Sequence, residues 1–205
     1  FETASLRNRV PSKPRPFETA SLRNRAALPT GGFCSALDAR PYGPLLVPMS
    51  ASPLSDRHVI LGVTGSIAAY KAALLVRRLK TAGAEVQVLM TPAAEHFVPA
   101  LTLGTLSERE VLTDIFPENE DGSWTQHVTL GEWADAFVVA PATAQTIAKL
   151  AHGFCDSMLT ATALSARAPL LVCPAMDREM YRHTATQRNL ERLRDNGYKV
   201  MPAAH

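Results

Sequence analysis

The stretch GVTGSIAAYK, residues 62–71, decides the fold of this chain. The apolar run HVILGV (58–63) leads into it, and apolar residues at helical spacing follow it as far as Thr81. A buried strand that turns directly into a helix is typical of an α/β protein. Gly65 and Ser66 stand at the turn, where free N–H groups and the helix dipole favour an anion such as phosphate. A plain strand-to-helix turn with a serine cap explains Ser66 equally well.

Strand-like and helix-like runs alternate through the rest of the chain. Further strands are predicted at 85–90, 136–141, 169–175 and 198–202. Further helices are predicted at 93–103, at 143–166 with an interruption near Gly153, and at 184–195. Continuous apolar strands that alternate with helices predict an α/β fold with a parallel sheet and helices on both faces.

The first 57 residues have no such pattern. FETASLRNR occurs at 1–9 and again at 17–25, and eight of the fifteen prolines precede His58. Proline at this density blocks helices and sheet ladders, so residues 1–57 are expected to be a disordered extension. It is a natural tail, a targeting peptide or spurious upstream translation, and we favour Met49 as the natural start. The domain is expected to occupy 58–205 and to be cut short at its C-terminal end.

Composition excludes several function classes. The chain is 46% hydrophobic and 20% charged, and no apolar run reaches the roughly 18 residues of a membrane span. The net charge of +2 divides into +4 over residues 1–48 and −2 over the remainder, which gives no electrostatic case for nucleic-acid binding. The three cysteines, Cys34, Cys155 and Cys173, have no metal-like spacing. They favour a reducing compartment, the cytoplasm, and no metal site is predicted.

Ligands of parallel sheets bind outside the carboxyl ends of the strands. The segments that follow the predicted strands are TGS (64–66), TPA (91–93), PATAQT (141–146) and PAMD (174–177). The first is neither a dinucleotide fingerprint nor a P-loop, because G-x-G-x-x-G and G-K-[ST] are absent. The polar residues of the third and fourth segments are candidates for ligand binding, and helix capping explains them at least as well.

His127, in QHVTLGEWAD, is a candidate general base between a polar loop and the next strand. Histidine is the side chain most often used for proton transfer near neutral pH. A lone histidine is more often structural or exposed than catalytic. No G-x-S-x-G or H-E-x-x-H motif is present.

Five motifs in this order resemble the flavin-dependent cysteine decarboxylases, and among them the phosphopantothenoylcysteine decarboxylase domain of coenzyme A biosynthesis. They are GVTGSIAAYKA, MTPAAEHFV, HVTLGEWAD, APATAQTIAKLAHGFCD and PAMDREMY. The resemblance covers about residues 58–205. It implies a Rossmann-like, doubly wound parallel sheet that binds FMN. It also implies that the phosphate expected at the turn of Gly65 and Ser66 is the phosphate of the flavin.

The resemblance also implies the site residues. Those implied to bind FMN are Gly65, Ser66, Ile67, Thr91, Pro92, Ala93, Phe97, Thr143, Ala144, Gln145, Thr146 and Ala175. Phe97 would pack at the flavin ring, and the alternative is an ordinary core residue. His127 matches the catalytic histidine. Met176 and Asp177 would contact the substrate, but Asp177 stands where the family has Asn, and Gln145 replaces a commoner Asn.

The implied reaction is FMN-dependent decarboxylation of 4′-phospho-N-pantothenoylcysteine to 4′-phosphopantetheine, in which oxidation of the thiol by FMN precedes loss of CO₂. The family's final proton donor is a cysteine on a segment beyond the end of this chain. Cys155 and Cys173 do not occupy its place and are expected to be structural. An ionised Asp177 would repel the substrate carboxylate unless a proton or a cation intervenes.

The implied partners are further copies of the chain and a synthetase. The family forms trimers or higher homo-oligomers with FMN at the subunit boundary, so that His127 would act on a neighbour's flavin. A CTP-dependent synthetase domain, in cis or in trans, would make the substrate. Three rival readings are a flavin prenyltransferase, a peptidyl-cysteine decarboxylase and a non-catalytic flavin-binding regulator.

Overall fold

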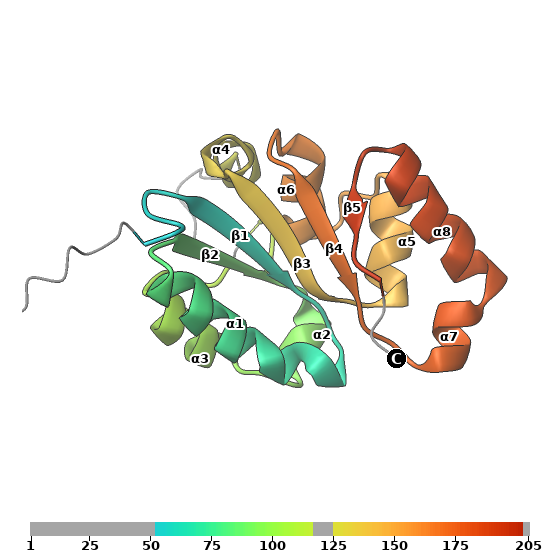
Figure 1. The fold of residues 1–205 in the computed structure, drawn as a ribbon, viewed down its shortest axis with the longest axis horizontal. Helices are drawn as coiled ribbons and strands as arrows, with labels where there is room; N and C mark the ends of the chain where they lie inside the picture. The colour runs from blue at the N-terminus through green and yellow to red at the C-terminus, as the bar shows by residue number, and fades with distance from the viewer. Residues whose placement is uncertain (1–51, 117–124, 203–205) are drawn as a thin grey trace, which may run out of the picture. The chain divides into compact units, whose positions relative to one another are not determined.

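The computed structural model describes residues 52–116 and 125–202. Five parallel strands form one sheet in the order β2-β1-β3-β4-β5 (Figure 1). Their bounds are β1 His58–Val63, β2 Glu85–Met90, β3 Ala136–Ala142, β4 Leu170–Pro174 and β5 Lys199–Val200. The predicted parallel sheet and its strand positions are confirmed, although β5 is shorter than the predicted 198–202.

Eight α-helices and one 3-10 helix join or flank these strands in the described residues. They are η1 Ile67–Ala69, α1 Tyr70–Thr81, α2 Pro92–Glu95, α3 Ala100–Ser107, α4 Gln126–Trp133, α5 Ala144–His152, α6 Met158–Ser165, α7 Arg178–Arg182 and α8 Thr184–Asp195. The predicted helices before Gly83, on either side of Gly153 and at 184–195 are confirmed. None of the helices described is long and apolar enough to cross a bilayer.

The single helix predicted at 93–103 is wrong. The chain forms α2 and α3 instead, and the break between them ends at Pro99. Proline disfavours helical backbone in the residue before it and has no N–H to donate, so a helix cannot continue through this position. Pro99 instead occupies the N-cap position of α3, with an extended backbone (φ −61°, ψ 138°).

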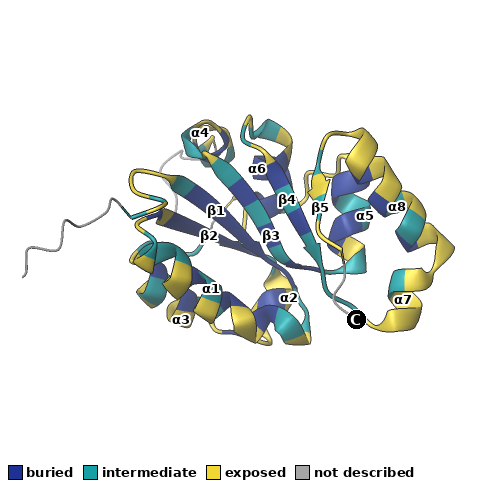
Figure 2. Ribbon diagram, viewed as in Figure 1, coloured by how far each residue is buried: buried dark blue, intermediate teal, exposed yellow. Residues whose placement is uncertain are grey.

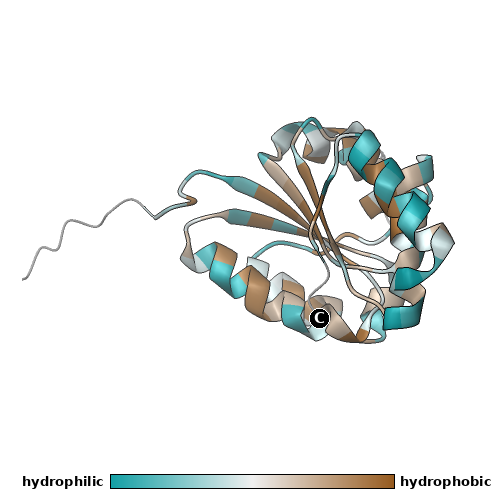
Figure 3. Cartoon of the chain, turned by 45° about the vertical axis from the view of Figure 1, so that its right-hand side comes forward, coloured by the Kyte–Doolittle hydropathy of each residue, from teal (hydrophilic) through white to brown (hydrophobic). Residues whose placement is uncertain are grey.

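β1 and β2 are buried on both faces, as the continuous apolar strands predicted, whereas buried and partly buried residues alternate along β3 and β4 (Figure 2). Val59, Leu61 and Val63 of β1 point to the face that α1 and α3 cover. Ile60 of the same strand joins Phe137 of β3 in the other core, which α4, α5, α6 and α8 complete. Figure 3 shows the strands as mainly hydrophobic, with hydrophilic segments along the outer helices. The fold is therefore doubly wound.

The described fold begins with a short turn before β1. The Leu54 N–H donates to the Ala82 carbonyl at 2.9 Å, and Leu54 packs against the core beside α1. The described contacts of the fold therefore include residues that precede His58, the predicted start of the domain. The extension expected at residues 1–57 otherwise lies outside the described residues, as does the expected end at 203–205.

Asp135, the acid of the W-A-D motif, joins β3 to the start of β1. Its Oδ2 accepts the His58 backbone N–H at 2.8 Å, and its Oδ1 lies 3.4 Å from the Arg57 guanidinium. The His58 N–H bond is the main reason that the pKa of this carboxyl lies below its usual value, and Arg57 lowers the pKa further. At the amino-terminal end of the sheet, this acid therefore has a structural position.

Asp135→Asn is expected to destabilise the protein in a pH-dependent way. Because the folded-state pKa is depressed, the carboxylate stabilises the fold fully above its unfolded pKa, about 3.9, and this contribution is lost as the pH falls through the folded value. Urea unfolding at about pH 7 should show a lower free energy of unfolding for the variant. The gap between variant and parent should narrow in acid, as the pH falls below the unfolded pKa. A gap that stays the same at neutral and acidic pH would contradict this account.

Candidate functional site

Two pockets lie along the carboxyl ends of the strands, where the sequence placed the candidate loops. The larger, about 1130 Å³, is bounded by the turn after β1, the segment after β4 and helix α7. The smaller, about 480 Å³, is bounded by the loops after β1, β2 and β3 and the start of α6. The structure therefore brings all four predicted loops together at one edge of the sheet.

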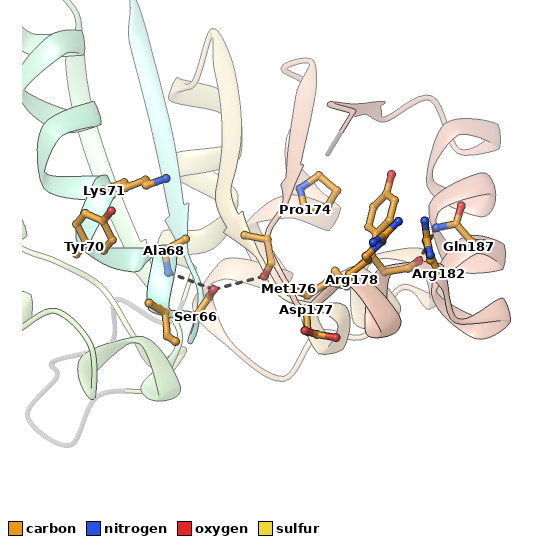
Figure 4. A pocket seen from close by; sticks show the side chains of 13 residues that line it. Ser66, Ala68, Tyr70, Lys71, Pro174, Met176, Asp177, Arg178, Arg182 and Gln187 are labelled. Atoms are coloured by element: carbon orange, nitrogen blue, oxygen red, sulfur yellow. Dashed lines mark hydrogen bonds between the residues drawn. The ribbon is translucent and has the colours of Figure 1, made fainter. Parts of the chain in front are cut away.

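The predicted flavin residues divide between these pockets. Those that line the smaller one are Gly65, Thr91, Pro92, Ala93, Thr143, Ala144, Gln145 and Thr146. Those that line the larger one are Ser66, Ile67 and Ala175, together with the predicted substrate residues Met176 and Asp177. The Ser66 hydroxyl donates to the Ala175 carbonyl at 3.4 Å, which links the turn after β1 to the segment after β4 (Figure 4).

Gly65 is required by the close approach of two loops. A Cβ at this position would lie 2.6 Å from the Ala93 Cβ and 3.0 Å from the Ala93 carbonyl carbon and oxygen. Contacts under 3.0 Å are essentially never seen for real Cβ atoms, and Ala93 has no flexible side chain that could move away. The turn after β1 and the loop after β2 therefore pack backbone to backbone beside the smaller pocket.

Thr64 connects the loops on either side of the point where the strand order reverses. Its fully buried hydroxyl donates to the Pro141 carbonyl at 2.7 Å and accepts the Thr143 N–H at 3.0 Å. Pro141 lies near the end of β3 and Thr143 directly follows that strand, whereas Thr64 directly follows β1. One hydroxyl therefore satisfies two backbone groups and fixes the separation of the two loops that border the smaller pocket.

Thr64→Val is expected to lower the free energy of unfolding and to weaken ligand binding in the smaller pocket. The valine has the same shape but leaves the Pro141 carbonyl and the Thr143 N–H unpaired, at about 1–3 kcal/mol for each buried group. Denaturant unfolding and titration with FMN should both show the loss. The matched control is Thr64→Ser, which keeps the hydroxyl and should retain most of the FMN affinity. If the valine and serine variants have the same stability and the same FMN affinity, the hydroxyl determines neither property.

Hydroxyl groups are concentrated around the smaller pocket, and most of them already have partners. Thr143 caps α5 by accepting the Thr146 N–H at 3.3 Å. At the larger pocket, Ser66 likewise caps η1 by accepting the Ala68 N–H at 3.3 Å, as the capping interpretation predicted. Thr91 Oγ1 differs, because it is buried and has no hydrogen-bond partner among the described residues. A buried unpaired hydroxyl at a pocket wall fits a polar ligand group.

Lys149 and Asp156 form an ion pair at the edge of the same pocket. The hydrogen bond from Lys149 is the largest reason that the pKa of Asp156 lies below its usual value, and burial opposes it. This pair joins α5 to the start of α6, where Ser157 and Thr160 form a reciprocal capping box. The pair compensates the charge of Lys149.

Asp177 caps helix α7, the alternative to ligand binding that the sequence analysis gave for this segment. Its Oδ1 accepts the Glu179 N–H at 2.9 Å and begins α7, and the residue also lines the larger pocket. An asparagine could accept the same hydrogen bond through its side-chain oxygen, so the substitution leaves the start of α7 unchanged. Compared with an asparagine, Asp177 adds one negative charge to the wall of the larger pocket.

His127 lies on α4, a helix that the sequence analysis did not predict, and it lines neither of the two pockets. Its carbonyl accepts the Ser165 hydroxyl at 3.0 Å, at the end of α6, whereas the pocket residue Ser157 caps the start of α6. A helix of this length separates its ends by about 12 Å, so a single chain does not bring His127 to the smaller pocket. The buried Nδ1 of His127 has no partner in the described residues.

Three other predicted residues lie apart from the pockets. Phe97 is 47% exposed and lines neither pocket, so the alternative that it is an ordinary core residue is wrong. Cys173 is partly buried in β4, and burial raises the pKa of its thiol. Cys155 is exposed and free. Over the same described residues, no group of three or more His, Cys, Asp or Glu side chains is placed to hold a metal ion.

The sequence analysis missed Thr64 and the basic residues of the larger pocket, Lys71, Arg178 and Arg182. A threonine directly after a continuous apolar strand was a usable signal for Thr64, because a buried hydroxyl needs partners. The basic residues gave no comparable signal, since lysine and arginine on helices are normally solvated.

Comparison with known proteins places this arrangement in a family. The flavoprotein family matches residues 49–205, which include both pockets. The chain belongs to the flavoprotein family. This flavoprotein domain is 48% identical to the coenzyme A biosynthesis bifunctional protein CoaBC of Bacillus subtilis over 145 residues, which are 71% of this chain and 36% of that protein. The chain thus spans little more than a third of the length of such relatives.

A shorter relative matches along most of its length. The flavoprotein domain is 44% identical to a probable phosphopantothenoylcysteine decarboxylase of Streptococcus mutans, over 70% of this chain and 80% of that protein. Two solved structures have the same fold. The FMN-dependent cysteine decarboxylase SpaF has 34% identity and a TM-score of 0.67, over 72% of this chain and 84% of that one. A PPC decarboxylase complexed with pantothenoylaminoethenethiol has 33% identity and a TM-score of 0.63, over 71% and 81%.

Proposed function

We propose that this flavoprotein domain decarboxylates 4′-phospho-N-pantothenoylcysteine to 4′-phosphopantetheine with FMN, as a carboxy-lyase of coenzyme A biosynthesis. The observation that carries the proposal is the meeting of four strand-end loops at two adjoining pockets, one rich in hydroxyls and one basic. The relative that this chain covers over 80% of its length is named for that decarboxylase activity. The SpaF structure is named for FMN-dependent cysteine decarboxylation.

The pocket residues fit FMN. Gly65 lines the smaller pocket without a side chain, and the unpaired Thr91 hydroxyl needs a polar partner. Thr143 and Thr146 add hydroxyls at the start of α5, where backbone N–H groups favour an anion. The pocket residues proposed to hold the flavin are Gly65, Ser66, Ile67, Thr91, Pro92, Ala93, Thr143, Ala144, Gln145, Thr146 and Ala175. Phe97, which lines neither pocket, is proposed to pack against the flavin ring from outside them.

The flavin, when bound, supplies the two-electron acceptor that an unactivated cysteinyl carboxylate lacks. The chain's part is to orient the substrate and to move its protons. A cysteinyl thiol has a pKa near 8.5 and is mostly protonated at neutral pH, so a base beside its sulfur promotes oxidation. We propose that the His127 imidazole takes that proton.

His127 would serve a neighbouring subunit. In one chain it lies beyond the far end of α6 from the smaller pocket, so the proposal includes a homo-oligomer, a trimer or larger, in which one chain's histidine faces another chain's flavin. Ile67, Tyr70 and Leu101 are exposed apolar side chains on the α1 and α3 side that such an assembly could cover. A CTP-dependent synthetase domain is the proposed further partner, because CoaBC relatives are bifunctional.

Met176 and Asp177 are the proposed substrate contacts. Asp177 would repel the substrate carboxylate if it stood alone, but three cationic side chains line the same pocket. We place the enzyme in the cytoplasm as part of the same proposal, because its substrate is a free thiol that a reducing compartment preserves.

The proposal is tested by mixing the FMN-loaded protein with the substrate in the absence of oxygen. Bleaching of the flavin absorbance near 450 nm, about the usual maximum of an oxidised flavin, together with release of CO₂, is the expected result. A flavin spectrum that stays unchanged, with no CO₂, would reject the enzyme and favour a non-catalytic flavin-binding regulator. Protein incubated with a substrate that lacks the thiol is the control.

A peptidyl-cysteine decarboxylase is the second candidate, and the similarity to SpaF favours it. The same reaction chemistry would then act on a cysteine at the end of a peptide. A peptide with a C-terminal cysteine should give no CO₂ if the first proposal is correct. Turnover of the peptide in preference to the pantothenoyl substrate would reverse the assignment.

A further inference from the structure

One wall of the larger pocket is basic. Arg178 and Arg182 of α7 line it on one side, and Lys71 of α1 lies across the pocket (Figure 4). Ser66 and Met176 lie between the two sides. Among the described residues that line this pocket, Asp177 is the only acid, so cationic side chains outnumber anionic ones there by three to one.

These three cations are not compensated by the protein. Among the described residues, none of them forms an ion pair, whereas Lys80, Lys149 and Arg109 each pair with a carboxylate. Asp177 uses Oδ1 to cap α7 and makes no ion pair with the arginines. A hollow lined by uncompensated positive charge attracts anions.

The two arginines are held on the same face of α7. They are four residues apart, a spacing at which helical side chains are neighbours and like charges repel. The helix is anchored to α8, because the Gln187 side chain donates to the Tyr181 carbonyl and the His183 ring caps α8 through the Ala185 N–H at 3.2 Å. A bound anion would relieve the repulsion between the arginines.

We infer that Arg178 and Arg182, with Lys71 opposite, bind the phosphate monoester of the substrate. The inference rests on the proposed function, which supplies a substrate that ends in a phosphate. Guanidinium groups present paired N–H donors that match phosphate oxygens. The flavin carries a phosphate monoester as well, but the hydroxyl-lined smaller pocket provides for it, and the basic wall lies on α7, beyond the predicted substrate residues Met176 and Asp177.

The first test compares the substrate with its analogue that lacks the 4′-phosphate. The parent enzyme should prefer the phosphorylated form in kcat/KM, and Arg178→Gln combined with Arg182→Gln should reduce this preference by about 10- to 100-fold, mainly through KM. The value of kcat/KM for the unphosphorylated analogue should stay the same. The matched control is Arg188→Gln combined with Arg194→Gln, which removes the same charge from exposed positions on α8.

A second measurement does not depend on turnover. Calorimetry on the FMN-loaded protein gives the affinities for 4′-phosphopantothenate and for pantothenate. The difference between these two affinities should be lost in the variant that combines Arg178→Gln with Arg182→Gln, the α7 variant. If the parent protein binds 4′-phosphopantothenate more tightly than pantothenate but releases no CO₂, the proposed reaction is rejected and the phosphate site is supported. If the parent protein turns over normally but shows no preference for the phosphorylated compound, the reaction is supported and the phosphate site is rejected.

A third comparison tests whether the basic wall binds the phosphate of the flavin instead of the phosphate of the substrate. Affinities for FMN and riboflavin are measured with the same variants, and their ratio should not change. If the α7 variant loses the preference for FMN over riboflavin instead, the basic wall binds the flavin's phosphate and the inference is overturned. An α7 variant that behaves like the α8 control in every assay would overturn it equally.

Discussion

Replacing Gly65 with valine is expected to abolish FMN binding while the sheet remains folded. The new Cβ would lie 2.6 Å from the Ala93 Cβ, and its methyl groups would enter the space beside the smaller pocket. The turn after β1 and the loop after β2 must then separate, and both contribute to the flavin site proposed above. Overpacking of this kind costs about 1–3 kcal/mol per inserted group, so we expect at least about a 100-fold loss of FMN affinity.

The measurement is the flavin absorbance that remains after desalting, followed by titration of the apoprotein with FMN. Gly104→Ala is the matched control, because the nearest atom to its new Cβ is the Arg109 carbonyl oxygen at 3.3 Å and the site lies on α3, outside both pockets. Far-UV circular dichroism checks that both variants fold. A Gly65→Val protein that binds FMN within about threefold of the parent would show that the loop contact is not required.

His127→Asn is expected to lower kcat by about 10²- to 10⁴-fold, the usual contribution of a positioned general base. Asparagine forms hydrogen bonds but does not titrate near neutral pH, so FMN affinity and substrate KM should change little. The assay is steady-state CO₂ release, with flavin content measured in parallel. His152→Asn is the control, because that imidazole contacts Asn189 and Arg192 on α8 rather than a pocket. A variant with normal kcat would remove His127 from the mechanism.

The two variants together distinguish action within a chain from action between chains. A Gly65→Val chain keeps its histidine and loses its flavin site, whereas a His127→Asn chain keeps its flavin site and loses its histidine. Mixed oligomers, formed by refolding the two chains together, should regain activity if the histidine acts on a neighbour's flavin. If His127 serves its own chain, the mixture should stay as inactive as either variant alone.

The sheet and the placement of the loops could be predicted because their signals are local. Apolar runs such as 58–63 and 85–90 are typical of buried parallel strands, and the rule that ligands bind at strand carboxyl ends then selected four loops. Gly83 and Gly153 marked helix ends correctly, with φ values of +94° and +73°. Each of these features depends on a few neighbouring residues.

Features that depend on tertiary contact were missed. Helices α4 and α7 are short, and they are held by packing against α6 and α8 more than by their own sequence. The double role of the Thr64 hydroxyl requires β1 and β3 to be paired, and no local pattern reports this pairing. No local pattern predicts that His127 lies away from both pockets, because this depends on how α4 packs on α6; only the resemblance implied it, by having the histidine act on a neighbour's flavin.

The strand order has a consequence for synthesis on the ribosome. β1 pairs with β3 along Val59–Gly62, yet 72 residues separate the end of β1 from the start of β3. At about 5–20 residues per second, translation leaves that edge of β1 without its partner for roughly 4–14 s. An unpaired apolar strand edge is a template for pairing with other nascent chains. Chaperone supply and growth temperature should therefore affect the yield of this protein more than the stability of its finished fold does, because β3 covers the edge as soon as it docks.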